Sequence, residues 1–272
     1  MSDAPSPRLP LHDGRSIPQL GFGMWEVPQR DAARVVEEGL AAGYRLIDGA
    51  AAYRNEEGLG EGVRASGLPR DEVFVTTKVW NDRHGDARRA VGESLDRLRL
   101  DRVDLVLIHW PAPQQDRYVD AWRDLVALRE EGAVSSVGVS NFDAAQIDRL
   151  AAETGVTPVL NQIELHPRLQ QPALRAAHRE RGVVTQSWSP LGRRRSFEDV
   201  RPVAERLGRS PAQVVLRWHV EIGCSVIPRS TRVEGLRENL ALWDFELSPE
   251  DHALIAALDR GERTGPDPAT FG

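Results

Sequence analysis

The sequence predicts a single α/β domain, a (β/α)8 or TIM barrel with an N-terminal β-hairpin across its bottom. Eight short apolar runs alternate with amphipathic helical segments along the 272 residues, and a barrel of this kind typically needs about 250 residues. Each strand is a continuous apolar run, as expected where both faces of a parallel sheet are buried. An open dinucleotide-binding sheet is less favoured, because Gly21 and Gly23 lack a third glycine and Glu26 occupies its place.

The N-terminal part contains the predicted hairpin. Residues 1–7 are rich in proline and are expected to be frayed. Residues 8–19 read as two short extended arms, and the Asp13-Gly14 pair between them supplies a turn with positive φ. The apolar run at residues 20–25 then predicts the first barrel strand.

The remaining elements follow in regular alternation. The helix predicted at residues 31–42 has apolar positions at helical spacing and is expected to end at Gly43. Later helices show the same spacing and are expected at residues 55–66, 86–98, 116–130, 143–153, 172–180, 198–207 and 211–221. The strands between them are expected at residues 46–48, 73–78, 105–109, 136–140, 159–164, 183–188 and 224–227. The predicted N-terminal caps are Asn55, Asn141 or Asp143, and Ser210 followed by Pro211.

Composition excludes several classes of protein. The net charge of -6 and the longest basic run, residues 193–195, argue against binding to nucleic acid. The single cysteine, Cys224, cannot form an intramolecular disulfide or a thiolate metal site, which fits a reducing compartment. The first residues lack the apolar core of a signal peptide, and no segment reaches the roughly 18 apolar residues of a membrane span. We therefore expect a cytoplasmic protein without a membrane partner.

Reactive and aromatic side chains lie where the predicted strands end, and barrel enzymes carry their chemistry there. These positions hold Trp25, Asp48, Lys78, His109, Ser140, Glu164, Trp188 and Ile227, followed by the polar residues 229–232. Each residue alone has a structural explanation: Asp48 can cap a helix, Lys78 can pair with it, and His109 can be a hydrogen-bonded core histidine. Taken together, they favour a catalytic site.

The chemistry of this set follows from pKa values. Tyr53 lies five residues after Asp48, and a tyrosine hydroxyl ordinarily ionises near pH ~10. A neighbouring ammonium favours the phenolate, so we expect Lys78 to lower the pKa of Tyr53 while Asp48 keeps Lys78 protonated. His109 can offer a ring nitrogen to a substrate oxygen. Such a site can protonate a carbonyl oxygen as a hydride reaches its carbon.

Nearly the whole chain resembles the aldo-keto reductases. The motifs that carry the resemblance occur in family order, and they read GYRLIDGAAAYRNE, FVTTKVW, RLRLDRVDLVLIHWP, VGVSNF, NQIELHP, WSPLG, VLRW and IPRSTRVEGLRENL. The closing stretch DRGERTGPDPATFG is similar to the C-terminal loop of bacterial members related to the 2,5-diketo-D-gluconate reductases. The resemblance implies one domain over residues 1–272, with residues 261–272 as a loop near the substrate pocket.

The resemblance also assigns roles to residues. It implies that Asp48, Tyr53, Lys78 and His109 form a catalytic tetrad with Tyr53 as general acid. It implies NADPH as cofactor and leaves NADH open, with binding residues at Ser140, Asn141, Gln162, Trp188, Ser189, Leu191, Gly192, Arg193, Arg194, Arg229, Ser230, Thr231, Arg232, Glu238 and Asn239. Among these, Trp188 would stack on the nicotinamide, residues 191–194 would cover the pyrophosphate, and residues 229–231 would hold the 2'-phosphate. Trp25, Trp80 and Trp110 would line a pocket for small aldehydes, ketones or dicarbonyls.

Three residues depart from the family pattern. Gly49 stands where many members have Thr or Cys, which predicts a looser turn after Asp48. Arg229 replaces the usual lysine beside the 2'-phosphate, a change that keeps the charge and adds donors. Gly235 stands where relatives often carry a second arginine, so we expect a weaker preference for NADPH than in those relatives.

Two other functions remain open at this point. A metal-dependent barrel hydrolase would use Asp48, His109, Glu164 and His166 as ligands, but the sequence has no H-x-H pair or other compact ligand spacing. A non-catalytic cofactor-binding barrel is disfavoured by the intact pair Tyr53 and Lys78. A serine nucleophile in residues 138–142 is weaker still, because the second glycine of the nucleophile elbow is missing. We expect a monomeric reductase that binds no metal.

Overall fold

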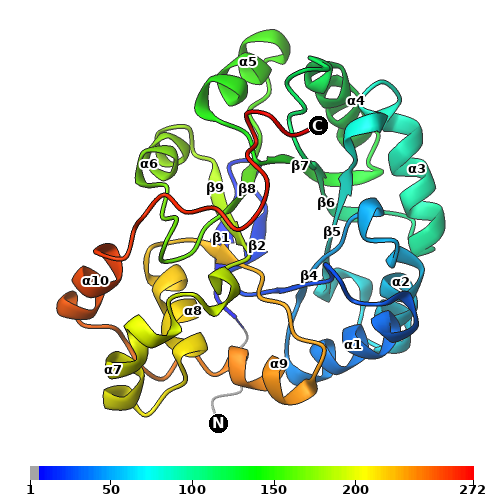
Figure 1. Ribbon diagram of the computed structural model, residues 1–272. Helices are drawn as coiled ribbons and strands as arrows, with labels where there is room; N and C mark the ends of the chain where they lie inside the picture. Colours follow the sequence, from blue (N-terminus) through cyan, green and yellow to red (C-terminus); the bar gives the residue numbers. More distant parts are fainter. Residues whose placement is uncertain (1–5) are drawn as a thin grey trace.

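The structure is a computed structural model that describes residues 6–272. Eight parallel strands form one sheet in the order β10-β9-β8-β7-β6-β5-β4-β3. Leu20, just before β3, forms a parallel bridge with Val226 of β10, so the first and last strands meet and close the barrel. Figure 1 shows the helices arranged around this barrel. The predicted fold class is confirmed.

The elements lie close to their predicted positions. The barrel strands are β3 (Phe22–Gly23), β4 (Leu46–Asp48), β5 (Phe74–Val79), β6 (Val103–Ile108), β7 (Val134–Ser140), β8 (Leu160–Glu164), β9 (Val184–Trp188) and β10 (Ser225–Val226). The helices are α1 (Gln29–Ala42), α2 (Glu56–Ala65), α3 (Ala87–Leu98), α4 (Tyr118–Glu130), α5 (Ala144–Thr154), α6 (Pro172–Glu180), α7 (Phe197–Leu207), α8 (Pro211–Glu221), α9 (Val233–Leu240) and α10 (Pro249–Ala256). Sequence analysis did not predict α9 and α10, which are both short.

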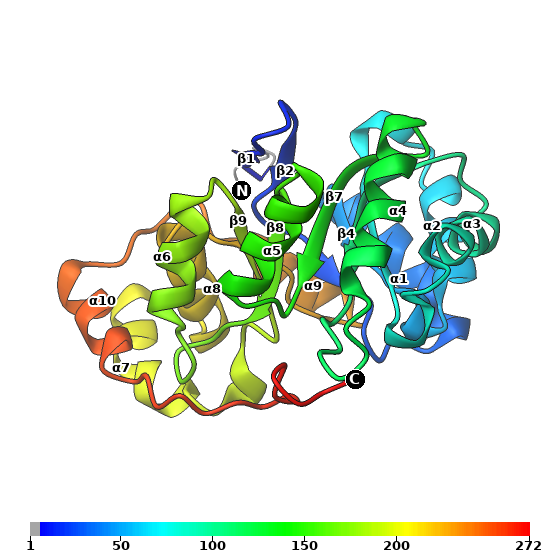
Figure 2. The ribbon, with the colours of Figure 1, turned by 90° about the horizontal axis from the view of Figure 1, so that it is seen from above.

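The predicted hairpin is confirmed and closes the bottom of the barrel. β1 (Arg8–Pro10) and β2 (Ser16–Pro18) are antiparallel, and Gly14 in their turn has φ 85°. Ile17 is fully buried and packs in one apolar cluster with inward-facing barrel residues such as Leu105 and Leu160. Figure 2 shows the hairpin at one end of the barrel and the C-terminal segment at the other. The hairpin therefore leaves only the carboxyl ends of the strands open for a site.

Residues 1–5 of the segment expected to be frayed lie outside the described residues. Its last two residues are hydrogen-bonded to the start of the barrel. The Leu20 amide donates to Ser6 Oγ at 2.9 Å, and the Gln19 amide donates to the Pro7 carbonyl at 2.7 Å.

Two of the predicted helix caps are confirmed and one is wrong. Asp143 caps α5 and Ser210 caps α8, each in a capping box with the glutamine three residues later. Asn55 does not cap α2 with its side chain. Its Nδ2 donates instead to the carbonyls of Met24 at 2.8 Å and Val27 at 2.9 Å. Asn55 thus binds the loop after β3 and links it to the segment that follows Tyr53. Local capping rules do not reveal such a long-range contact.

The helices were compared with the length and hydropathy of a membrane span. Within residues 6–272, no helix is both long and apolar enough to cross a bilayer.

Candidate active site

Four predicted catalytic residues converge at the carboxyl end of the barrel. Asp48 ends β4, and Lys78 lies in the adjacent strand β5. His109 follows β6 directly, and its amide donates to the carbonyl of Val79 at 3.0 Å. Tyr53 ends a short 3-10 helix, η1 (Ala51–Tyr53), which turns the chain back over the strand ends. Three neighbouring strands and the short helix η1 therefore bring together four residues from three separate segments of the sequence.

Lys78 is the centre of this group. Its Nζ donates to Asp48 Oδ2 at 2.7 Å, to the Gly49 carbonyl at 2.8 Å and to the Tyr53 hydroxyl at 3.0 Å. These bonds use all three ammonium protons. Lys78 and Asp48 are 1% and 2% exposed, and a buried ion pair is tolerated only when its hydrogen bonds are satisfied in this way. Gln162 completes the pair by donating from Nε2 to Asp48 Oδ1 at 2.7 Å.

The expected loosening at Gly49 is wrong. A Cβ at this position would lie 2.7 Å from Leu59 Cδ1 and 3.1 Å from the Thr76 carbonyl oxygen. The Gly49 amide also donates to that carbonyl at 2.9 Å. The glycine therefore allows a close approach between the turn and the α2 side of the barrel, and the turn is tightly packed.

The predicted pKa of Tyr53 is also wrong in direction. Burial raises the pKa of the Tyr53 hydroxyl well above its ordinary value, and the negative charge of Asp48 raises it further. Lys78 is itself paired with Asp48, so the ammonium presents little net positive charge to the phenol. Burial also lowers the pKa of the Lys78 amine, although Asp48 and Glu56 oppose that change. Tyr53 is therefore a protonated phenol at neutral pH, in the form required of a proton donor.

His109 is a neutral ring between two aromatic side chains. Burial, and then the charge of Lys78, lower the pKa of His109 well below its ordinary value. Its ring lies 5.6 Å from the Tyr53 ring and 4.9 Å from the Trp80 ring, centroid to centroid. Its Nδ1 is buried and has no hydrogen-bond partner among the described residues. A neutral imidazole here can still donate one hydrogen bond to a bound molecule.

Aromatic side chains surround the tetrad. Trp25 lies 5.2 Å from the Tyr53 ring and is 55% exposed. Trp80 and Trp110 both contact Phe271, at centroid distances of 6.2 Å and 4.6 Å. The three tryptophans were predicted from the sequence, but Phe271 was not, because its only signal was its place in the closing stretch. The rim therefore presents apolar surface beside polar groups, the usual composition of a small-molecule site.

The residues predicted to hold the nicotinamide also lie together, at the ends of β7, β8 and β9. Asn141 Nδ2 donates to the His109 carbonyl and to Ser140 Oγ, both at 3.0 Å. Ser140 Oγ donates to the Gln162 carbonyl at 2.8 Å, and Trp188 Nε1 donates to Asn141 Oδ1 at 2.8 Å. Asn141 has φ 66°, a left-handed conformation that asparagine tolerates. This network fixes the amide of Asn141 beside the tetrad and fixes Trp188 at the edge of the site.

The loop predicted to cover the pyrophosphate has unusual backbone angles. Ser189, Gly192, Arg193 and Arg194 have φ values of 51°, 50°, 52° and 64°. Left-handed residues other than glycine are uncommon and cluster at functional segments. Leu191 precedes the short helix η4 (Gly192–Arg194) that this backbone forms. Arginine amides and side chains in such a loop are suited to an anionic group.

The predicted 2'-phosphate segment follows β10. Arg229 Nη1 lies 3.3 Å from Glu26 Oε2, and the two side chains are 44% and 60% exposed. Ser230 Oγ donates to the Arg232 carbonyl at 2.9 Å and accepts from the Arg232 amide at 3.2 Å, while Thr231 lies between them. Glu26 was not predicted as the partner of Arg229, because the two residues are distant in the chain. Arg229 is thus paired with the exposed carboxylate of Glu26, and a bound anion can take the place of that carboxylate.

The predicted adenine residues lie on α9, next to this segment. Asn239 is 5% exposed, and the Glu238 carbonyl accepts from Gln213 Nε2 at 3.2 Å. The predicted cofactor residues therefore form a series that comes from β7 to β10, from the segments after these strands and from α9. The half-buried Trp188, an amide network, a left-handed loop and an arginine form a set that fits a phosphorylated dinucleotide.

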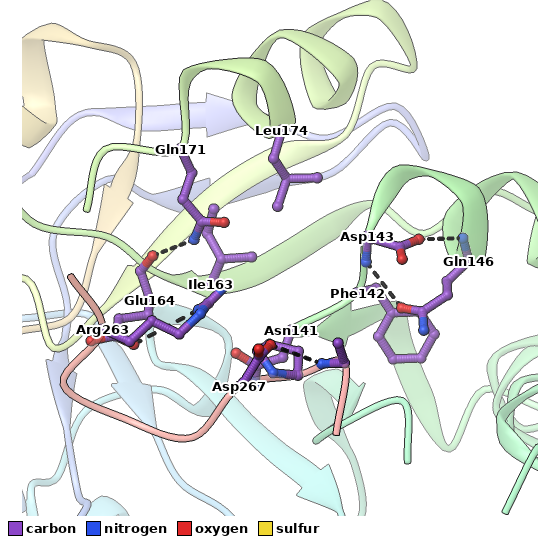
Figure 3. Close-up of a pocket in the computed structure, with 12 residues that line it drawn as sticks. Asn141, Phe142, Asp143, Gln146, Ile163, Glu164, Gln171, Leu174, Arg263 and Asp267 are labelled. Carbon is purple, nitrogen blue, oxygen red and sulfur yellow. Dashed lines mark hydrogen bonds and ion pairs between the residues drawn. The ribbon is translucent and has the colours of Figure 1, made fainter. Parts of the chain in front are cut away.

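A separate cavity lies beside this series. It measures ≈ 140 Å³, and Asn141 and Glu164 line its barrel side. The other walls are Arg263 and residues 267–269 of the tail and the first turns of α5 and α6, as Figure 3 shows. None of the four tetrad residues lines it, so it is not the reaction centre.

The ligands required by the metal-hydrolase alternative are not gathered. Among residues 6–272, no three or more His, Cys, Asp and Glu side chains are placed to hold a metal ion. Asp48 is engaged with Lys78, and Glu164 Oε1 accepts from His166 Nε2 at 3.1 Å. The arrangement instead offers a protonated phenol, a neutral histidine and arginines at positions 193, 194 and 229.

Comparison with known proteins points the same way. Residues 19–260 match the model of the Aldo/keto reductase family. The chain is 47% identical over 266 residues to methylglyoxal reductase DkgA of Salmonella typhimurium, covering 96% of this chain and 97% of that protein. It is 44% identical to a Gox0644 variant solved in complex with NADPH, with a TM-score of 0.95 and coverage of 99% and 100%. It is 33% identical to a Bombyx mori aldo-keto reductase solved in complex with NADP, with a TM-score of 0.89 and coverage of 96% and 95%.

Proposed function

Because the chain belongs to the aldo/keto reductase family and is an NADP(H)-dependent oxidoreductase, we propose that it reduces small aldehydes, ketones or dicarbonyls to alcohols. Tyr53 is the general acid in this proposal. The observation that carries it is the triple contact of Lys78 with Asp48, Gly49 and the Tyr53 hydroxyl. This contact joins a buried cation to a phenol that is protonated at neutral pH.

The proposed reaction divides into a hydride and a proton. Bound NADPH supplies the hydride to the carbonyl carbon. The Tyr53 hydroxyl gives its proton to the carbonyl oxygen, which becomes the alcohol, and solvent later reprotonates Tyr53. The phenolate formed in between lies 3.0 Å from the Lys78 ammonium, where the opposite charge stabilises it in a water-poor site. Neutral His109 donates a hydrogen bond to the same carbonyl oxygen and orients it.

The cofactor residues have distinct roles in this proposal. Asn141, with Ser140 and Gln162, would orient the carboxamide of the nicotinamide, and Trp188 would support its ring. The loop at residues 191–194 would cover the pyrophosphate. Arg229, with residues 230–232, would bind the 2'-phosphate in exchange for its contact with Glu26. Glu238 and Asn239 would contact the adenine.

The substrate class follows from the walls of the pocket. Trp25, Trp80, Trp110 and Phe271 give it apolar, aromatic sides, and these exclude water and favour compact carbonyl compounds. Relatives named methylglyoxal reductases make a small dicarbonyl the first compound to test. The expectations of a monomer and of a cytoplasmic location stay predictions.

The test is a panel of carbonyl compounds that includes methylglyoxal, an aromatic aldehyde and a simple ketone. Turnover is followed by loss of reduced-nicotinamide absorbance, with NADPH and NADH in parallel. We expect turnover of several members with NADPH preferred. NADPH binding without turnover of any member would instead favour the non-catalytic cofactor-binding barrel.

A further inference from the structure

The C-terminal tail, residues 259–272, crosses the end of the barrel that carries the proposed site (Figures 1 and 2). It is held where it arrives and where it ends. The amides of Arg260 and Glu262 both donate to the Arg168 carbonyl at 3.1 Å. At the far end, Gln114 Nε2 donates to the Thr270 carbonyl at 3.1 Å. Neither contact fixes the middle of the tail.

Glu164 fixes the middle. It is the last residue of β8 and is 0% exposed. Its Oε1 accepts from the Thr264 amide and from Thr264 Oγ1, both at 2.6 Å, and its Oε2 accepts from the Gly265 amide at 3.3 Å. Figure 3 shows Arg263 of the tail next to Glu164, and Arg263 Nη1 lies 3.9 Å from Oε2.

The chemistry of this contact requires an ionised carboxylate. Burial alone would raise the pKa of the Glu164 carboxyl, but hydrogen bonds from His166 and Thr264 outweigh burial and lower that pKa. Both oxygens accept hydrogen bonds, and a glutamine side chain can accept at only one of them. A buried carboxylate is costly when its partners are absent, so Glu164 strongly favours the arrangement in which the tail is bound.

The anchored tail presses on Trp188. A Cβ on Gly265 would lie 2.4 Å from Trp188 Cη2, so the backbone of the tail runs against the outer edge of the indole. The opposite side of that ring is fixed by the bond from Nε1 to Asn141 Oδ1. Six residues beyond Gly265, Phe271 packs against Trp110 and Trp80. Between the anchors at Arg168 and Gln114, the contact at Glu164 thus holds the tail against Trp188 on its way to Trp80 and Trp110.

We infer that Glu164 is a positioning residue for carbonyl reduction, which binds Thr264 and Gly265 of the tail and thereby seats Phe271 as one wall of the substrate pocket. The inference rests on the proposed function for its link to catalysis. Glu164 touches neither the tetrad nor the carbonyl. Its loss therefore weakens substrate binding and leaves the proton and hydride steps intact once substrate is bound.

The test compares Glu164→Gln and Thr264→Val with a matched control, Glu262→Gln. The control changes a tail carboxylate that is 45% exposed and lies 3.6 Å from Arg168. For Glu164→Gln we expect the KM for an aromatic aldehyde to rise about tenfold, the effect of one lost hydrogen bond to a charged group. kcat is expected to stay within about twofold. Thr264→Val is expected to raise KM by a smaller factor, and Glu262→Gln is expected to leave KM unchanged.

Limited trypsin digestion supplies a readout that does not depend on activity. Release of the tail exposes the bond after Arg263, so cleavage there is expected to be faster in Glu164→Gln and Thr264→Val than in the wild type and in Glu262→Gln. The melting temperature of each variant is measured alongside.

The outcomes are distinct. A lower melting temperature with unchanged KM and unchanged cleavage would make Glu164 a structural residue only and overturn the inference, as would no change in any measurement. If Glu164→Gln does not fold, Thr264→Val decides the matter by the same two readouts. If the wild type reduces no carbonyl compound, the proposed function fails. Faster cleavage at Arg263 would still support the anchoring of the tail by Glu164, and unchanged cleavage would overturn it.

Discussion

Substitution of Arg229 tests how the chain selects its cofactor. Arg229 pairs with Glu26 at 3.3 Å, with both side chains well exposed, and such a surface pair contributes only about 0.2 to 1 kcal/mol. A charge-assisted bond to a phosphate contributes about 1.5 to 3 kcal/mol. Exchanging the carboxylate for the phosphate therefore gains about 0.5 to 3 kcal/mol, or about 2- to 100-fold in affinity for NADPH over NADH.

The assay is the dissociation constant of each cofactor, measured by quenching of tryptophan fluorescence. Arg229→Ala is expected to weaken NADPH binding by that factor and to leave NADH binding almost unchanged. Glu26→Gln removes the competing carboxylate and is expected to tighten NADPH binding by up to about fivefold, the upper limit for a surface pair. Arg30→Ala is the control, since Arg30 is 85% exposed at the start of α1. Equal weakening of both cofactors in Arg229→Ala would refute the reasoning, because the arginine would then support the loop and not read the phosphate.

Three further predictions follow from the same geometry. Lys78→Met leaves Asp48 buried without its cation. Turnover is expected to fall at least about 10²-fold, and the free energy of unfolding is expected to fall by about 3 to 5 kcal/mol. Kinetics and calorimetry measure the two effects, and an unchanged melting temperature would contradict the expected loss of stability. Burial raises the pKa of Tyr53, so the phenol stays protonated and kcat for reduction is expected to be flat between about pH 6 and 9. Alcohol oxidation needs the phenolate, so its kcat is expected to rise across that range. A fall in kcat for reduction near neutral pH would contradict the raised pKa. Gly235→Arg places a Cβ 2.5 Å from Ser230 Oγ, the end of a side chain that can rotate away. We therefore expect the added cation to sharpen the NADPH preference with little change in melting temperature, and an unchanged preference would contradict this.

Much of the fold could be predicted because the barrel depends on local patterns. Each strand is a short apolar run and each helix an apolar stripe, so boundaries such as those of α6 and α8 match the predicted residues. The location of the candidate site could also be predicted, since the carboxyl ends of parallel strands meet at one end of the barrel. Asp48, Lys78 and His109 were found in this way.

Other features depend on contacts between distant segments, and no local pattern encodes them. Glu26, after β3, meets Arg229, after β10, where the first and last strands close the barrel. Asn55 binds the loop after β3 in place of capping its own helix. The pKa of Tyr53 was predicted in the wrong direction because the sequence shows the charges near the phenol but not its burial. Phe271 comes from a tail that Glu164 and the loop after β6 bind through long-range hydrogen bonds.

The most direct test of the central claim is the turnover of Tyr53→Phe with NADPH and a carbonyl substrate. The variant keeps the ring beside Trp25 and His109 and removes only the hydroxyl bound to Lys78. If Tyr53 donates the proton, kcat is expected to fall by about 10² to 10⁴-fold while the dissociation constant of NADPH stays unchanged. Near-normal turnover in this variant would contradict the assignment of Tyr53 as general acid.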